Sequence, residues 1–238
     1  MCPATLLVLL TVGRPPDPPA FFKDAMPTLT FYYKKPDPDR GPKLLAGLIA
    51  PDTLDHPWSK GNPHPVALTA AMLGDMARGK PELVRKYEAL FADAAPAGRR
   101  VVLQALERCG DADTRRWLAA RRADPAADPR DALEALDKAL AKPERPRDKA
   151  ATTPKELDFL WADFFVSGEF APAGRVLDAL DLPDEPAHAT LRRVARWSFG
   201  SNLRQHPRLV ELTRANLPGR PPASRQAAEE LLREAAKD

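Results

Sequence analysis

Apolar side chains recur at helical spacing most regularly between residues 153 and 182. Thr153, Pro154 and Glu156 predict where a first helix begins, because threonine followed three residues later by glutamate makes a capping box. The apolar positions of that helix are Leu157, Leu160, Trp161, Phe164 and Phe165. Gly168 predicts its end, since glycine readily adopts the left-handed conformation that closes a helix. This half of the stretch therefore predicts a helix with one broad apolar face.

A second helix is predicted directly after this turn. Its apolar positions are Phe170, Ala173, Val176, Leu177 and Leu180. The two helices form a hairpin that contains no catalytic motif, so we expect it to be a packing centre. Trp161 lies in the middle of the apolar face and is expected to be buried. We also expect helices from before residues 143–153 to pack there, which would give the two halves of the chain one shared core.

The remainder of the chain predicts further helices. Apolar stripes of helical period alternate with short turns, and the 27 prolines stand mostly between the stripes. The pattern predicts about ten helices in all. Residues 28–33 could form a strand by composition, but no second strand is available for pairing, so a helix is expected there. Residues 51–62 are expected to form a loop.

The predicted fold class is therefore all-α. Helix pairs recur about every 26 to 30 residues, which favours stacked antiparallel helical hairpins in an irregular, solenoid-like array of the HEAT or tetratricopeptide type. No residue pattern repeats at a fixed period, so the repeat interpretation concerns architecture alone. Residues 21–238 are assigned to a single all-helical domain, with a candidate internal boundary at residues 143–153.

Residues 1–20 are interpreted as a signal peptide followed by a proline-rich linker. An apolar run from residue 4 to residue 12 is too short to span a bilayer but fits the hydrophobic region of a signal peptide. No lysine or arginine precedes this run, and a buried N-terminal strand is the alternative. We expect the native polypeptide to begin after about Gly13 and to be exported to the periplasm or secreted; a cytoplasmic location is the alternative.

Charge and cysteine content narrow the classes of function. The chain has 36 basic and 33 acidic residues and a net charge of +3, which gives no reason to expect nucleic acid or an acidic membrane as a partner. With two cysteines, Cys2 and Cys109, a disulfide framework and a metal site of paired thiolates are excluded. Cys109 ends a predicted helix, where the helix dipole disfavours a thiolate, so it is a poor nucleophile.

The histidines do not have the spacing of a metal site. Zinc needs three or four converging ligands, usually with two of them close in sequence, and His56, His64, His188 and His206 do not provide this. We therefore expect no metal ion and no cofactor. His56 and His64 each precede a proline and are interpreted as loop residues, and His206 is interpreted as part of a helix junction.

Carboxylates beside aromatic residues suggest a second kind of chemistry. Asp158 and Asp163 lie on the predicted central helix, and paired carboxylates next to aromatic rings are how glycosidases act on sugars. A separation of five residues places the two side chains on diverging faces of a helix. We therefore expect both to cover the solvent face.

An arginine-rich segment is the candidate binding site. Arg192 and Arg196 share a helix face near Trp197. Arg204 follows shortly after the end of the same predicted helix. These four residues could bind a nucleic acid or the carboxylates of a peptide. Asp184 and Glu185 precede them and could neutralise the arginines, in which case the segment is a solvated helix face.

Three segments carry a resemblance to a known set of proteins. They are FYYKKPDPD at residues 31–39, LDFLWADFFVSGEFAPAGRVLDAL at residues 157–180 and ARWSFGSNLRQHPRLVEL at residues 195–212. In order and content they resemble a family of bacterial all-helical, repeat-like proteins, many of them exported, that has no assigned activity. The resemblance covers most of the chain after residue 28 and departs from the family pattern at Val166-Ser167. It implies an all-helical fold and transfers no functional residue.

Two functions are compatible with these observations. The first is a non-enzymatic helical binding or scaffold protein that recognises a protein or peptide partner, since stacked helices present extended surfaces and no catalytic motif is found. The alternative is an enzyme with an α/α-barrel site built from Asp158, Asp163 and His56 or His64, acting on a carbohydrate or another small substrate. Convergence of these side chains in one deep pocket would favour the enzyme, and a shallow site of mixed character would favour binding.

Overall fold

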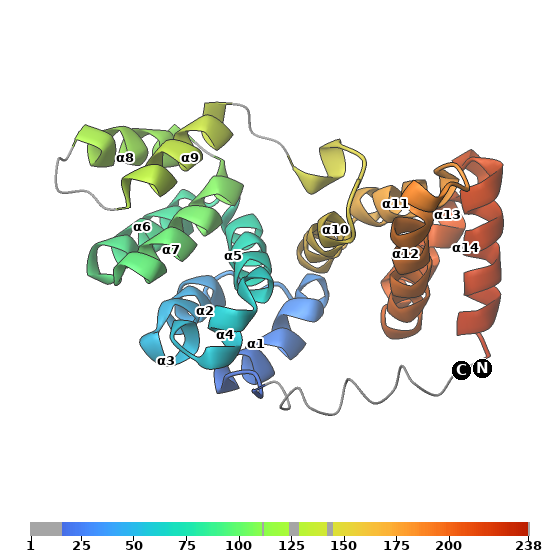
Figure 1. Ribbon diagram of the computed structural model, residues 1–238, viewed down its shortest axis with the longest axis horizontal. Coiled ribbons are helices and arrows are strands. Elements are labelled where there is room, and N and C mark those ends of the chain that lie inside the picture. The colour runs from blue at the N-terminus through green and yellow to red at the C-terminus, as the bar shows by residue number, and fades with distance from the viewer. Residues whose placement is uncertain (1–15, 111, 124–128, 142–144, 238) are drawn as a thin grey trace.

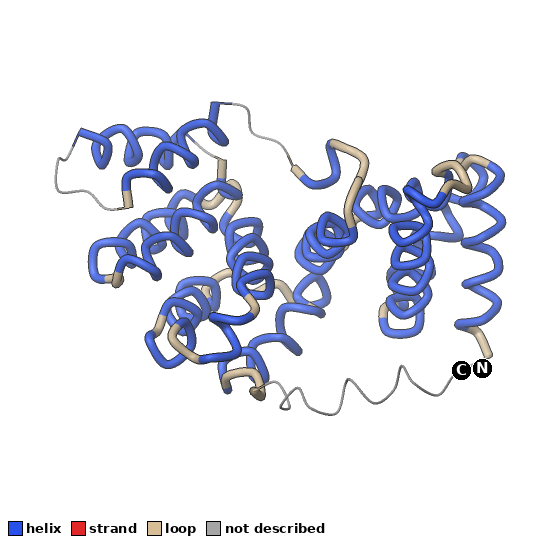
Figure 2. The backbone as a smooth tube through the Cα atoms, in the orientation of Figure 1, coloured by secondary structure: helices blue, strands red, loops and turns tan. Residues whose placement is uncertain are grey.

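The computed structural model describes residues 16–110, 112–123, 129–141 and 145–237, and within these ranges the chain is built from helices without strands. This described part contains fourteen α-helices (Figure 1), and Figure 2 distinguishes them from the loops and turns that connect them. The predicted all-α fold class is confirmed. The helix count exceeds the expected ten, partly because residues 51–61, expected to be a loop, form two short helices. The predicted leader at residues 1–13 lies outside the described residues.

Nine helices of the described part of the chain form an N-terminal lobe. They are α1 (Ala20–Thr30), α2 (Arg40–Ile49), α3 (Pro51–Leu54), α4 (Pro57–Gly61), α5 (Pro63–Ala77), α6 (Pro81–Asp93), α7 (Pro96–Cys109), α8 (Ala112–Ala123) and α9 (Arg130–Ala141). The 3₁₀ turn η3 (Tyr32–Lys34) follows α1, so residues 28–33 are helical as predicted. Several of the helices begin with proline, whose missing N–H has no intrahelical partner at that position.

The centre of the N-terminal lobe is α5, whose packing partner is α7. The two helices cross closely at Gly74, where a Cβ atom would lie 2.1 Å from the carbonyl oxygen of Ala105. Only glycine permits this approach. The contact of α5 with α7 is much more extensive than its contact with α6, the next helix along the chain. Spatial neighbours are therefore not simply successive hairpins, and the predicted solenoid-like stacking is not confirmed.

Five helices form a C-terminal lobe on the other side of the molecule. They are α10 (Pro154–Ser167), α11 (Phe170–Asp178), α12 (Pro186–Gln205), α13 (Pro207–Asn216) and α14 (Pro222–Ala235), with 3₁₀ turns η4 (Pro146–Asp148), η5 (Ala179–Asp181) and η6 (Leu217–Gly219). Within the described residues, no helix of either lobe combines the length and the apolar character needed to cross a bilayer. Figure 1 shows α10 between the N-terminal lobe and the remaining C-terminal helices.

The ends of α10 are those predicted from the sequence. The carboxylate of Glu156 accepts hydrogen bonds from the backbone N–H groups of Thr152 at 2.7 Å and Thr153 at 2.9 Å. These bonds hold the pKa of Glu156 below its usual value. At the other end Gly168 has φ 65° and donates its N–H to the carbonyl of Phe164 at 2.7 Å. The capping box and the glycine stop are both confirmed.

Side chains of α10 belong to both hydrophobic cores. Ala162 is part of the core of the N-terminal lobe, whereas Leu157, Trp161 and Phe164 are part of the second core. Phe165 packs against both. The helix contacts α1 and α5 on one side and α11 and α12 on the other. Helices that precede residues 143–153 in the chain therefore pack on α10, as expected. The interpretation of residues 21–238 as a single domain requires this arrangement.

A buried histidine joins the two lobes at one end of α10. His206, between α12 and α13, has no exposed surface, and its Nδ1 lies 3.1 Å from the hydroxyl of Tyr33 in η3. Aromatic rings surround it, with Phe165 stacked at 5.1 Å and Phe31 at 4.8 Å. Its Nε2 has no hydrogen-bond partner among the described residues. Burial, and then the charge of Lys34, lower the pKa of His206 to about 4.

Trp161 gives a direct test of the packing of α10. Its exposed fraction is 4%, its Nε1 donates to the Ser198 hydroxyl at 3.1 Å, and its ring contacts Phe199 at 5.7 Å. We expect Trp161→Ala to lower the free energy of unfolding by about 3–5 kcal/mol, measured by chemical denaturation. Trp197→Ala is the matched control, because that side chain is 70% exposed, and it should change stability by less than about 0.5 kcal/mol. Wild-type stability of Trp161→Ala would contradict the packing described.

His206 predicts how stability depends on pH. Because its pKa is lower in the folded protein than the ordinary 6.5, the neutral form is favoured by folding. The stabilisation is complete above pH 6.5 and is lost as the pH falls towards 4. The drop from 6.5 to about 4, at about 1.4 kcal/mol per pH unit, corresponds to about 3 kcal/mol.

Between pH 7 and pH 4, the free energy of unfolding should fall further for the wild type than for His206→Gln. The expected difference is about 3 kcal/mol. The two proteins are compared by urea denaturation at a series of pH values. The variant retains the charged groups around the site, namely Lys34, Arg208 and Glu211. An identical pH dependence in both proteins would show that His206 does not titrate as described.

Candidate functional site

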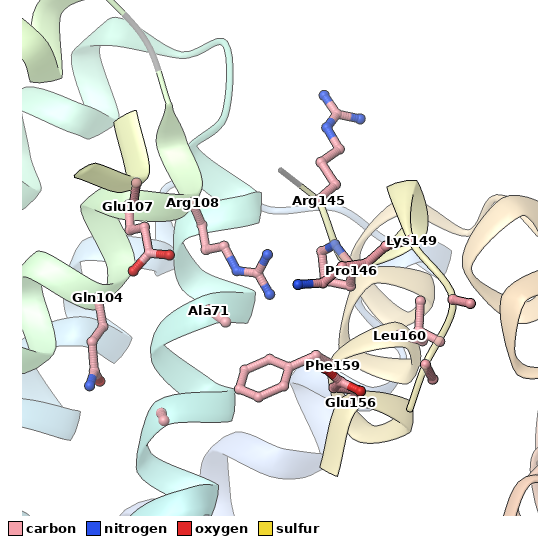
Figure 3. A pocket seen from close by; sticks show the side chains of 14 residues that line it. Ala71, Gln104, Glu107, Arg108, Arg145, Pro146, Lys149, Glu156, Phe159 and Leu160 are labelled. Atoms are coloured by element: carbon pink, nitrogen blue, oxygen red, sulfur yellow. The ribbon is translucent and has the colours of Figure 1, made fainter. Parts of the chain in front are cut away.

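A cleft of about 460 Å³ opens between the two lobes, and it is the candidate site. One wall comes from α5, α7 and α9, and the other from α10 and the segment around η4 (Figure 3). The side chains that give it chemical character are Gln104, Glu107, Arg108, Arg145, Lys149, Glu156 and Phe159. Alanine, leucine and proline side chains complete the lining. The cleft is therefore mixed in character, with apolar walls and a few charged groups.

Two basic side chains extend into this cleft from opposite walls. Figure 3 shows Arg108 reaching from α7 towards α10 and Lys149 reaching back from the segment after η4, whereas Arg145 points away at the rim. The guanidinium of Arg108 lies 5.5 Å from the centroid of the Phe159 ring, which is a cation–π contact. This contact places the guanidinium beside the Phe159 ring at the cleft.

The two acidic residues of the lining have different environments. Glu156 uses its carboxylate to cap α10 and is occupied by backbone N–H groups. Glu107 lies on the wall next to Arg108 with part of its side chain accessible. Desolvation raises the pKa of Glu107, and the charge of Arg108 opposes that effect. The lining thus contains one carboxylate that caps α10, that of Glu156, and a second one, that of Glu107, that lies close to the charge of Arg108.

A histidine and an aspartate from the two lobes meet beside Phe159. His64 Nε2 and Asp158 Oδ2 are 2.8 Å apart, although 94 residues separate them in sequence. The His64 ring also contacts the Phe159 ring edge-on at 5.6 Å. The interpretation of His64 as a loop residue is wrong: it lies in the first turn of α5, which α10 covers. Neither His64 nor Asp158 lines the cleft.

The expectation that Asp163 covers the solvent face is also wrong. Its side chain is only 6% exposed. Its carboxylate accepts a hydrogen bond from Nε of Arg147 at 2.7 Å and a second hydrogen bond from the same guanidinium. Arg147 also pairs with Glu169, and its backbone carbonyl accepts from Nε of Arg175 at 2.8 Å. The 3₁₀ turn η4 lies over this side of α10 and covers Asp163. The pattern of α10 alone places that residue on the solvent face. The pair fixes η4 against α10.

The other histidine of the enzyme hypothesis has a local structural role. His56 Nδ1 accepts a hydrogen bond from the backbone N–H of Trp58 at 3.2 Å and so caps α4. The structure therefore does not bring Asp158, Asp163, His56 and His64 together in one deep pocket. In the parts of the chain that the structure describes, no group of three or more histidine, cysteine, aspartate or glutamate side chains could hold a metal ion.

The predicted arginine site lies on the surface of α12, away from the cleft. Arg192 pairs with Asp184, as the sequence suggested, and Arg196 pairs with Glu230 at 2.9 Å. The Trp197 side chain stands exposed, and Arg204 is an exposed residue near the end of the helix. None of the four lines the cleft between the lobes. Arg192 and Arg196 therefore form ion pairs with carboxylates of their own lobe.

Sequence reasoning missed the residues that form the cleft. Arg108, Lys149 and Phe159 come from three separate segments, and no local motif connects them. The one available signal was the basic segment at the proposed boundary, which supplies Arg145, Arg147 and Lys149. No protein-family model matches the chain, and no curated protein and no solved structure matches it either. The resemblance to a bacterial all-helical family stays a prediction.

Proposed function

We propose that the protein is a non-enzymatic binding or scaffold protein that recognises a protein or peptide partner in the cleft between its lobes. The observation that carries this proposal is the mixed lining of the cleft, where Phe159 and Leu160 give apolar surface and Gln104 and Arg108 give polar contacts. Ligand sites typically combine an apolar lining with a few polar groups and occur where two structural units meet. A polypeptide segment presents the same mixture of groups.

The enzyme alternative has less support. A histidine oriented by a carboxylate can act as a general base, and His64 with Asp158 is such a pair. However, Asp163 is held by Arg147 and His56 caps a helix, so neither is available for catalysis. The described lining of the cleft contains no serine, threonine or cysteine that could act as a nucleophile. We therefore place binding before catalysis.

The proposed setting of this function is outside the cytoplasm. The apolar run at residues 4–12 and the proline-rich linker after it support export of the chain. An extracytoplasmic binding protein would meet polypeptide partners at the cell envelope or beyond it.

The proposal predicts that peptides bind in the cleft. A random peptide library is displayed against the purified chain, and enriched peptides are then cross-linked to variants that carry benzoylphenylalanine at one position. Gln104, in the cleft, should cross-link strongly, whereas Gln205, exposed on α12, should not. Enrichment of no peptide, or equal cross-linking at both positions, would contradict the proposed function.

A further inference from the structure

We propose that the contact between His206 and residues 31–34 is an acid-sensitive latch, in which protonation of the histidine releases this segment from the junction of α12 and α13. His206 lies at that junction, and residues 31–34 follow α1 and include η3. Tyr33 and His206 are 173 residues apart in sequence, so the latch joins the two lobes. Neither side of the latch lines the cleft, and its test is therefore independent of the proposed function.

The closed latch provides too few hydrogen-bond partners for a charged His206. The side chain has no exposed surface, its Nδ1 lies 3.1 Å from the Tyr33 hydroxyl, and its Nε2 has no hydrogen-bond partner among the described residues. Protonation places a hydrogen on both ring nitrogens, and the single hydroxyl can serve only one of them. The other N–H of the cation would stay buried without an acceptor, which is costly for a charged group.

The aromatic residues around His206 do not compensate for a positive charge. Phe31 lies against its ring at 4.8 Å, and Phe164 and Phe165 of α10 lie at 5.7 Å and 5.1 Å. The π faces of such rings attract a cation, but they cannot replace the water that accepts its N–H groups in solution. The aromatic surroundings therefore fit the neutral imidazole.

The charged groups near the latch also favour the neutral form. From η3, Lys34 adds a positive charge that disfavours a second one on His206. From α13, Arg208 and Glu211 act on Tyr33 with opposite signs. The contacts that the described residues make with His206 include no carboxylate. A protonated His206 thus has no counter-ion in the closed latch.

Other contacts between the lobes remain when the latch opens. Helix α10 packs more extensively on α5 than on either α1 or η3. His64 of α5 and Asp158 of α10 lie 2.8 Å apart, and a protonated His64 would form an ion pair with that carboxylate. Protonation therefore does not weaken this second contact. We expect residues 31–34 to detach while α10 stays on α5.

The size of the effect follows from the two protonation equilibria of His206. Its pKa is about 4 in the closed latch and returns towards the ordinary 6.5 when the ring reaches water. Opening is therefore coupled to the uptake of a proton, so acid favours the open form. Between pH 7 and pH 5 the equilibrium constant for opening should rise roughly twentyfold, and the rise should level off below about pH 4.

Hydrogen–deuterium exchange of the full chain at pH 7 and pH 5 measures this opening. The N–H of Lys34 donates to the carbonyl of Phe31 at 3.0 Å, and that of Lys35 donates to the carbonyl of Tyr32 at 3.1 Å. After correction for the intrinsic pH dependence of exchange, the protection of these two N–H groups should fall roughly twentyfold in the wild type. Backbone N–H groups in the middle of α12 should keep their protection.

Three variants identify the titrating group. His206→Gln keeps an acceptor for the Tyr33 hydroxyl but takes up no proton, so protection at the latch should be the same at both pH values. Tyr33→Phe removes the hydrogen bond, so it should lower protection at both pH values and keep the pH dependence. His64→Gln is the matched control, because it removes the other histidine that joins the lobes, and it should keep the twentyfold change.

Each alternative outcome would overturn the latch. Unchanged protection of the wild type between pH 7 and pH 5 would show that the segment is not released by acid. An equal fall in His206→Gln, or loss of the pH dependence in His64→Gln, would assign the titration to another group. A parallel loss of protection throughout α12 would indicate global unfolding. If His206→Gln does not fold, as judged by circular dichroism, the wild type, Tyr33→Phe and His64→Gln still decide the question.

Discussion

The structure depends on the burial of α10 from two sides. Its apolar face fills the core of the C-terminal lobe, and its opposite side lies against α5 and α1 of the N-terminal lobe. A helix in this position cannot leave polar side chains unpaired, because an isolated charge without water is costly. Asp163, which is buried, is therefore paired with Arg147, whereas Asp158 stays half exposed beside His64. Both lobes are attached to α10 by apolar packing and by one polar side-chain pair each.

The cleft follows from this arrangement. Arg147 is inserted against Asp163 and Glu169, which fixes η4 and places the flanking Arg145 and Lys149 beside α10. On the other side, α5 and α7 cross closely at Gly74, so Arg108 near the end of α7 projects towards Phe159. The position of each cationic group is thus set by a packing contact elsewhere. The cleft is a consequence of how the two lobes meet at α10.

Local features of the fold could be predicted from the sequence, whereas the site could not. The capping box at Thr153, the stop at Gly168 and the burial of Trp161 depend on residues a few positions apart and on one helical face. The two short helices after residue 50 were missed because Pro51 and Pro57 are equally typical of turns and of helix starts.

The pairing of His64 with Asp158 and of Arg147 with Asp163 depends on contacts between separate elements. The helical period of α10 alone assigns both aspartates to solvent. Asp158 stays half exposed beside His64, whereas η4 covers Asp163 and reverses its assignment. In the segment around Arg192, the nearby Asp184 could be identified as a partner from the sequence, whereas the pairing of Arg196 with Glu230 of α14 could not.

The central claim is that α10 makes one cooperative unit of two lobes. Differential scanning calorimetry tests it most directly, because it compares the heat absorbed on unfolding with the enthalpy derived from the sharpness of the transition. The account predicts one transition in which the calorimetric and van't Hoff enthalpies agree. Two resolved transitions, one for each lobe, would contradict it.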